Sequence, residues 1–288
     1  MRDKLPIVLD LFCKFGVLSS REIQIGVGAG LRLAQANKYL YRARMRGYIR
    51  RRTHPTKWIF AYEATEKLFE EISTDGRKSL RPQKDEELAH RLACSHVLLN
   101  LCRRSFVSGV AVEHELSPKE LALFCIERIP DGIIQVTQTG QPSFEMALEV
   151  ETSEKSIERT KKILSNYEKT ILGKRHYCQG LLIVATTERG FAMYQRLLAE
   201  CSPALLKRVI LSHEIDLSDV GENVLGQRLK SIQENAFASG ASKRFLAREG
   251  VKYLNHIKRR PLLKGTESRR RSADGLTGAT SGMSKPDG

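Results

Sequence analysis

Residues 144–151 read Phe-Glu-Met-Ala-Leu-Glu-Val-Glu, and this strict alternation decides the fold class. Large apolar side chains occupy one set of alternate positions, and Glu145, Ala147, Glu149 and Glu151 occupy the other. Because successive side chains of a strand point to opposite faces, Glu149 and Glu151 are predicted to lie on one face, about 7 Å apart. The stretch therefore predicts a strand with an apolar face and an acidic face.

Outward from this strand, helical and strand patterns alternate. Strands are predicted over 110–116, 133–137, 143–152, 177–187 and 208–212, with a further apolar run at 124–129. Helices are predicted over 85–103, from a cap at Thr152-Ser153 to about 172, and over 190–200. The run 181–185, Leu-Leu-Ile-Val-Ala, is typical of a central buried strand. The order α-β-β-β-α-β-α-β predicts an α/β domain with a mixed sheet.

The first 73 residues have a different pattern. Apolar residues at helical spacing predict a helix that ends at Gly16, and Ser19 with Glu22 predicts the capped start of a second helix. A third helix is predicted over 31–46, followed by short strands at 48–52 and 58–62 and a closing helix over 64–72. Two helices, a basic helix and a hairpin, in this order, predict a winged helix-turn-helix.

The net charge of +15 is concentrated in two regions of the 288-residue chain. Residues 31–60 contain nine Lys and Arg and no Asp or Glu, and residues 243–288 contain twelve Lys and Arg against four acids. Two separated basic regions favour a polyanion such as DNA. The alternative for the first region is a solvated helix face or a protein contact. The predicted DNA-binding residues are Arg32, Gln35, Lys38, Arg42, Arg46, Arg50, Arg51, Arg52 and Lys57.

These patterns divide the chain into four predicted parts. They are a winged helix DNA-binding domain over 1–73, a linker over 74–84, an α/β domain over 85–217 and a basic extension over 218–288 whose end is expected to be disordered. No apolar run is long enough to span a bilayer, and no signal peptide is evident. Six scattered cysteines without a Cys-x-x-Cys pair indicate reduced thiols, so we expect a cytoplasmic protein without membrane insertion.

An acidic cluster in the second domain suggests chemistry. Asp131 follows Pro130 at a turn, and it meets Glu149 and Glu151 if the flanking strands pair. Clustered carboxylates repel one another unless a cation holds them, and oxygen ligands favour Mg²⁺ or Mn²⁺. Such a metal activates water near a phosphodiester. The alternative is an amphipathic surface strand with solvated glutamates.

Pro130-Asp131, Glu149-Val150-Glu151 on the next strand and the following helix resemble the PD-(D/E)xK nuclease superfamily. With the preceding winged-helix pattern, residues 4–212 look like the plasmid replication-relaxation proteins, which include the MOBC-type mobilization relaxases. The resemblance implies that Asp131 and Glu149 hold the metal. Glu151 stands where the family usually has lysine, so it is expected to act as a ligand or base. Lys161 or Lys162 would then stabilise phosphate charge, with Lys155 a weaker candidate.

The implied function is a relaxase that binds a plasmid origin of transfer or replication and nicks one strand with a divalent metal. A conjugation coupling or secretion-system protein is an implied partner, and no small-molecule cofactor is expected. A non-catalytic DNA-binding accessory or replication regulator, and a defence endonuclease that cuts both strands, remain alternatives. Glu113, Glu115, His90 and His96 are possible further contributors, whereas the helical spacing of Tyr167 predicts a packed residue rather than a nucleophile.

Overall fold

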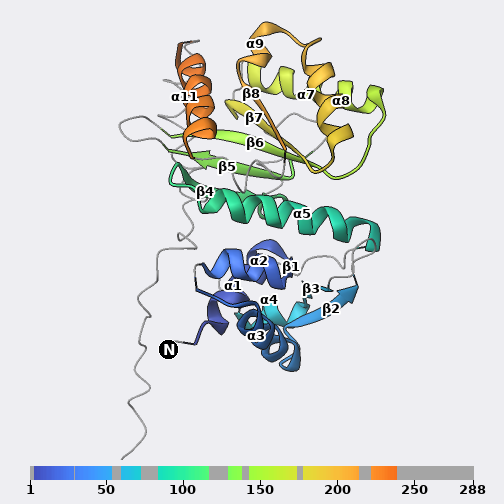
Figure 1. Ribbon diagram of the computed structural model, residues 1–288, viewed down its shortest axis with the longest axis vertical. Helices are drawn as coiled ribbons and strands as arrows, with labels where there is room; N and C mark the ends of the chain where they lie inside the picture. Colours follow the sequence, from blue (N-terminus) through green and yellow to red (C-terminus); the bar gives the residue numbers. More distant parts are fainter. Residues whose placement is uncertain are drawn as a thin grey trace, which may run out of the picture.

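The computed structural model describes residues 3–28, 30–53, 60–72, 84–116, 129–137, 143–173, 178–213 and 222–238. Over these ranges the protein is a mixed α/β structure, and its larger sheet combines antiparallel and parallel strands (Figure 1). The predicted linker lies almost entirely outside the described residues, as do Lys57 and the basic chain end from residue 239.

The N-terminal part follows the predicted order of elements. It comprises α1 (Leu5–Phe15), β1 (Val17–Ser19), α2 (Ser20–Val27), α3 (Leu33–Met45), β2 (Ile49–Thr53), β3 (Phe60–Ala64) and α4 (Glu66–Ile72). Gly16 ends α1 at a φ of 74°, a backbone angle that favours glycine. The predicted capping box is present, because the Ser19 side chain accepts from the backbone of α2 and the Glu22 carboxylate accepts from Ser19 N at 2.9 Å.

A small antiparallel sheet closes this part, in the order β1-β3-β2. The β2–β3 pair matches the predicted hairpin, with Arg51 opposite Tyr62. The short strand β1 was not predicted, because three residues are too few to show an alternating pattern.

The larger sheet has the order β4-β5-β6-β7-β8. Its strands are β4 (Val107–Val112), β5 (Gly132–Val136), β6 (Phe144–Glu151), β7 (Gly180–Ala185) and β8 (Val209–His213). The pairs β4–β5 and β5–β6 are antiparallel, and β6–β7 and β7–β8 are parallel. The prediction of an α/β domain with a mixed sheet is therefore confirmed.

Two boundaries differ from the prediction, and one expected strand is not tested. The strand expected over 110–116 is β4, which starts earlier, and Glu113–Glu115 form the 3-10 turn η1 instead. The helix after β6 is α7 (Ile157–Leu172), and its cap is Ser156 rather than Thr152-Ser153, because the Ser156 hydroxyl accepts from Arg159 N at 3.2 Å. The expected strand at 124–129 lies outside the described residues except for Ile129.

Helix α5 (Asp85–Cys102) lies between the N-terminal elements and the large sheet (Figure 1). Toward the N-terminal side, Leu88 and Leu92 pack with residues of β1 and β3, and Leu99 lies against Gly26 of α2. Toward the sheet, Leu98 reaches the backbone at Gly132. The main hydrophobic core is consequently continuous from α1 through α5 to the even-numbered side chains of β6.

The opposite face of the sheet packs against α7 and α8 (Glu188–Leu198) with the short α9 (Pro203–Leu206), and a second core fills this layer. Helix α11 (Glu222–Ala238) was not predicted, and its Leu229 and Ile232 join the main core on the α5 side. Within the described ranges, no helix combines the length and apolar character needed to cross a membrane.

Candidate functional site

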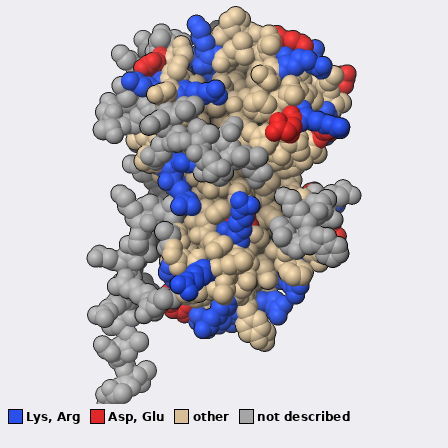
Figure 2. All heavy atoms as spheres, in the orientation of Figure 1, with Lys and Arg blue, Asp and Glu red and all other residues tan. Residues whose placement is uncertain are grey.

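Basic side chains gather on α3, at the end of the molecule away from the large sheet (Figure 2). Arg32, Lys38 and Arg46 are exposed there, and the described residues provide no ion-pair partner for any of the three. Gln35 has a structural role, because its Oε1 accepts a hydrogen bond from Arg32 N at 3.0 Å and caps the helix. The predicted basic face of α3 is thus open to an anionic partner at three positions.

Arg42 of α3 differs from its neighbours because an acid already engages it. Its Nη1 and Nη2 lie 2.9 Å and 2.8 Å from the two carboxylate oxygens of Asp3. The hydrogen bond from Arg42 lowers the pKa of the Asp3 carboxyl below its usual value. A DNA phosphate that bound Arg42 would have to compete with this exposed carboxylate.

The arginines of β2 also differ in whether an acidic side chain already engages them. Arg50 and Arg52 both pair with the buried carboxylate of Glu63 on β3, each at 2.7 Å, and Arg52 also pairs with Asp85 at the start of α5. Arg51 is exposed, and its guanidinium lies 3.2 Å from the centroid of the Phe60 ring. Arg50 and Arg52 therefore hold the hairpin together, and Arg52 also joins it to α5, whereas Arg51 faces solvent.

Asp131 directly precedes β5 and is buried at 8% exposure. The register of β5 and β6 pairs Gly132 with Leu148, so Asp131 lies beside Glu149. One carboxylate oxygen of Asp131, Oδ2, accepts a hydrogen bond from Val150 N at 2.8 Å. The other, Oδ1, lies 3.0 Å from Nε2 of His90 on α5. Asp131 is therefore held between β6 and α5.

Glu149 and Glu151 share the face of β6 that packs on α7 and α8, as their spacing predicts. Both are almost fully buried, at 2% and 1% exposure. Tyr167 of α7 donates a hydrogen bond to Glu149 Oε1 at 2.6 Å, and Tyr194 of α8 donates one to Glu151 Oε2 at 3.2 Å. The solvated surface strand that the sequence left as an alternative is therefore wrong.

Lys155 is the lysine that the structure places at these carboxylates. Its Nζ lies 2.5 Å from Glu151 Oε2, and its side chain is only 9% exposed. It reaches Glu151 because the segment between β6 and α7 is not helical. Lys161 instead pairs at 2.7 Å with Glu200 on the surface, and Lys162 is exposed on α7. The two helix lysines favoured by the sequence do not join the carboxylates.

The other possible contributors have partners outside this site. Glu115 pairs with Lys14 of α1 at 3.2 Å, and Glu113 pairs with Arg91 of α5 at 2.7 Å. His96 lies 2.8 Å from Glu22 of α2, on the opposite side of α5 from His90. The first contact connects α1 to η1, and the other two connect α5 to η1 and to α2, so these contacts of Glu115, Glu113 and His96 have structural roles.

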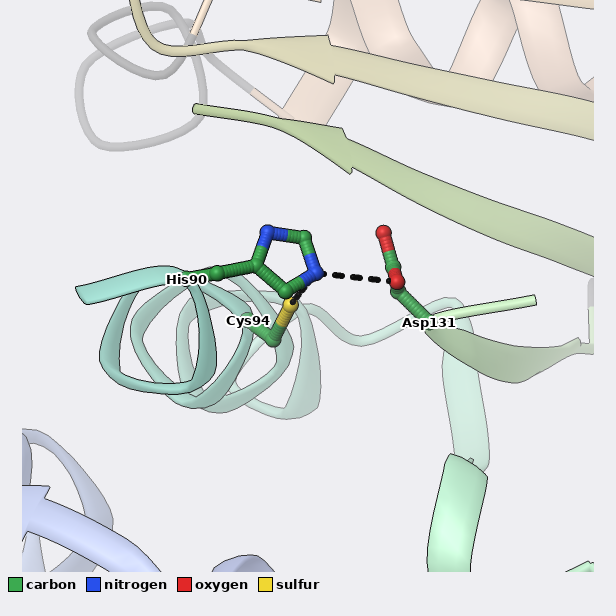
Figure 3. Close-up of side chains that lie close together, drawn as sticks. All are labelled: His90, Cys94 and Asp131. Atoms are coloured by element: carbon green, nitrogen blue, oxygen red, sulfur yellow. Dashed lines mark hydrogen bonds and ion pairs between the residues drawn. The ribbon is translucent and has the colours of Figure 1, made fainter. Parts of the chain in front are cut away.

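A group of three potential ligands does form around Asp131. Figure 3 shows His90 and Cys94, one turn apart on α5, both directed toward it. The His90 Nε2, Cys94 Sγ and Asp131 carboxylate atoms all lie within 4.8 Å of one another, and Sγ is 3.5 Å from Nε2. Among the described residues this is the only such group. The predicted trio of Asp131, Glu149 and Glu151 does not come together in this way.

Negative charge nevertheless concentrates here. Burial raises the pKa of the Cys94 thiol well above its usual value, and the carboxylates of Asp131 and Glu149 raise it further. Burial and the Glu149 carboxylate also raise the pKa of Tyr167. The carboxylates of Asp131 and Glu149 therefore both raise the pKa of Cys94 and that of Tyr167. The Tyr167 hydroxyl is buried, protonated and bonded to Glu149, which is unsuited to a nucleophile.

The donor set decides which cation these residues suit. Mg²⁺ prefers several oxygen ligands, and imidazole and thiolate favour transition metals such as zinc. Asp131 offers oxygen to either class, but its two nearest partners offer nitrogen and sulfur. The residues closest to chelating geometry therefore do not fit Mg²⁺, and they fit a borderline transition metal.

Sequence reasoning could reach only part of this group. The spacing His-x-x-x-Cys over residues 90–94 places both side chains on one helix face, which is a detectable signal. Whether these two side chains meet Asp131 depends on how α5 packs on the sheet, and the spacing does not show that packing. Comparison with protein-family models, curated proteins and solved structures finds no match for this chain.

Proposed function

We propose that the protein binds duplex DNA through α3 and the β2–β3 hairpin, in the manner of a winged helix. The order of α2, α3 and the hairpin supports this, as do the exposed cations of α3. A helix of this size enters the major groove, where its side chains meet base edges and phosphates. Arg51 on β2 would add a phosphate contact beside the groove.

We further propose that the α/β part hydrolyses a phosphodiester, as a PD-(D/E)xK-like nickase of the plasmid mobilization relaxase type. The observation that carries this is the position of Asp131 beside Glu149 on paired antiparallel strands, with Lys155 brought to the same end of β6. The arrangement of the sheet, with three antiparallel strands followed by two parallel ones, is a further support for this proposal.

Each residue would then have a distinct task. A divalent metal bound at Asp131 would supply an activated water and neutralise phosphate charge. Lys155, with its ammonium held at Glu151, would stabilise the charge that develops on the phosphate. Glu149, bonded to Tyr167, would position or accept a proton at the attacking water. No covalent bond to tyrosine is involved.

A second candidate is a non-catalytic DNA-binding accessory or replication regulator. The burial of Glu149 and Glu151, and their contacts with tyrosines and Lys155, favour it, because these contacts also satisfy carboxylates in a purely structural core. Under this reading the large sheet supports the N-terminal part and has no chemistry.

Supercoiled plasmid that carries the protein's own gene and flanking DNA distinguishes these candidates. It is incubated with purified protein and, separately, Mg²⁺, Mn²⁺ or Zn²⁺. Open circles support the nickase, linear product a double-strand endonuclease, and unchanged supercoils the regulator. Asp131→Asn and Lys155→Ala should each abolish nicking, whereas Lys161→Ala, the matched surface lysine, should retain it. Equal activity in all four proteins would overturn the assigned site.

A further inference from the structure

We propose that His90, Cys94 and Asp131 form a binding site for one transition metal ion of the zinc class. His90 and Cys94 stand at i and i+4 on α5, so both side chains leave the same face of the helix. That face packs on the sheet at the start of β5, where Asp131 meets it (Figure 3). Two rigid elements thus bring one nitrogen, one sulfur and one oxygen together.

The separations agree with a tetrahedral ion. With zinc bonds of about 2.3 Å to sulfur and about 2.1 Å to nitrogen or oxygen, a tetrahedral angle separates S and N by about 3.6 Å and N and O by about 3.4 Å. The structure has 3.5 Å between Cys94 Sγ and His90 Nε2, and 3.0 Å between Nε2 and Asp131 Oδ1. These two separations need shifts of only a few tenths of an ångström, and the third, between Cys94 Sγ and the Asp131 carboxylate, is within 4.8 Å.

Neighbouring groups orient two of the three ligands. The second ring nitrogen of His90, Nδ1, lies 3.3 Å from the hydroxyl of Thr152. An N–H at Nδ1 that donates to this hydroxyl leaves the lone pair of Nε2 directed at the site. The second oxygen of Asp131, Oδ2, accepts a hydrogen bond from Val150 N, and this contact orients the carboxylate with Oδ1 toward His90. Metal ligands characteristically have such outer partners.

The simplest alternative is an imidazolium of His90 paired with Asp131. That pair explains the contact between His90 Nε2 and Asp131 Oδ1. In that pair Nε2 carries a proton, so it has no lone pair to accept a hydrogen bond from the Cys94 thiol. A metal ion satisfies all three atoms together. His90 is 30% exposed at its side chain, whereas Asp131 is buried, so an ion has a path of entry past the imidazole.

Three protein ligands leave a fourth tetrahedral position, the pattern of catalytic rather than structural zinc sites. The identification of this ion as the nuclease metal rests on the proposed function, because Asp131 belongs to both the metal site and the proposed nuclease site. Metal binding itself does not depend on DNA cleavage, so the two are measured separately.

The test uses full-length protein freed of metal by a chelator and then titrated with Zn²⁺ or Co²⁺. We expect one ion per chain by calorimetry, and a thiolate-to-cobalt charge-transfer absorption in the near ultraviolet. Cys94→Ala should remove this absorption and weaken zinc binding by more than about tenfold. Cys102→Ala, on the same helix two turns away, is the matched control and should change neither.

Thr152→Val gives a finer test, because it removes only the outer partner of His90. We expect zinc binding to weaken by about tenfold while the thiolate absorption remains. Circular dichroism checks that each variant is folded.

Absence of zinc and cobalt binding by the folded wild type, or an unchanged thiolate absorption in Cys94→Ala, would overturn the site. Zinc binding without plasmid nicking would retain this site and reject the nickase. Plasmid nicking by a folded wild-type protein that binds neither zinc nor cobalt would reject this site and retain the nickase.

Discussion

The DNA-binding proposal makes a quantitative prediction for Lys38 and Arg46. Both side chains are exposed on α3, and neither has an ion-pair partner among the described residues, so each is available to a phosphate. Each phosphate contact contributes about 0.9 to the slope of log affinity against log salt on duplex DNA. Lys38→Ala with Arg46→Ala should therefore reduce the magnitude of this slope by about 1.8.

This reduction of the slope predicts an easily measured change in how much affinity is lost as salt is added. Between 50 and 200 mM salt, two fewer contacts make the loss of affinity about tenfold smaller than in the wild type. Fluorescence anisotropy with a labelled duplex, repeated at four or more salt concentrations, gives the slope directly. The duplex need not contain the cognate site, because phosphate contacts operate on any sequence.

A matched control separates this effect from the loss of two positive charges. Lys169 and Lys207 are exposed on α7 and after α9, on the other side of the large sheet from α5, and their replacement changes the net charge equally. Lys169→Ala with Lys207→Ala should leave the slope unchanged. Equal slopes for wild type and the α3 variant, or equal reductions in both variants, would refute binding through α3.

Three further outcomes follow from individual contacts. Asp3→Asn should increase the slope by about 0.9, because it releases Arg42 for a phosphate; anisotropy that shows a smaller slope would contradict this. Glu22→Ala should lower the free energy of unfolding by about 3–5 kcal/mol in urea, because it removes the buried carboxylate that pairs with His96, and a loss below 1 kcal/mol would argue against the pair. Burial acts to raise the pKa of Glu22, but hydrogen bonds with His96 and Ser19 lower it overall, so this stabilisation is present above pH 4.5 and disappears as the pH falls through the lowered pKa. Gly180→Ala should destabilise by about 1–3 kcal/mol, because its Cβ would lie 2.9 Å from a backbone oxygen of the neighbouring strand segment; an unchanged thermal midpoint would show that β7 can shift.

Local patterns were sufficient for most elements of the N-terminal part. The capping box at Ser19 and Glu22 and the glycine at position 16 act within a few residues, so sequence spacing determines them. The alternation of β6 likewise placed Glu149 and Glu151 on one face, because the period of two is a property of the strand itself. The alternation does not show that tyrosines and Lys155 cover this face, because that depends on how α7 and α8 pack on the sheet.

Helix α5 shows where local patterns fail. The sequence predicts a single buried stripe at Leu88, Leu92, Leu99 and Cys102, as for a helix that lies on one surface. In the structure two faces are covered, because Leu98 packs on the sheet while Leu92 packs on the N-terminal part. A helix buried on two sides has no clear polar face, so its pattern cannot show which residues meet which neighbour.

The two buried faces of α5 also relate the proposed DNA surface to the proposed metal site. His96 pairs with Glu22 on one face, and His90 and Cys94 meet Asp131 on the other. Lys14 of α1 adds a second connection, since its Nζ donates to Val110 O of β4 at 2.8 Å. Loss of these polar contacts leaves charges buried, so displacement of the N-terminal part relative to the sheet carries a high cost. DNA held at α3 would therefore be presented to Asp131 in a fixed orientation, and the position of the cut, if the protein nicks, would lie at a constant distance from the bound site.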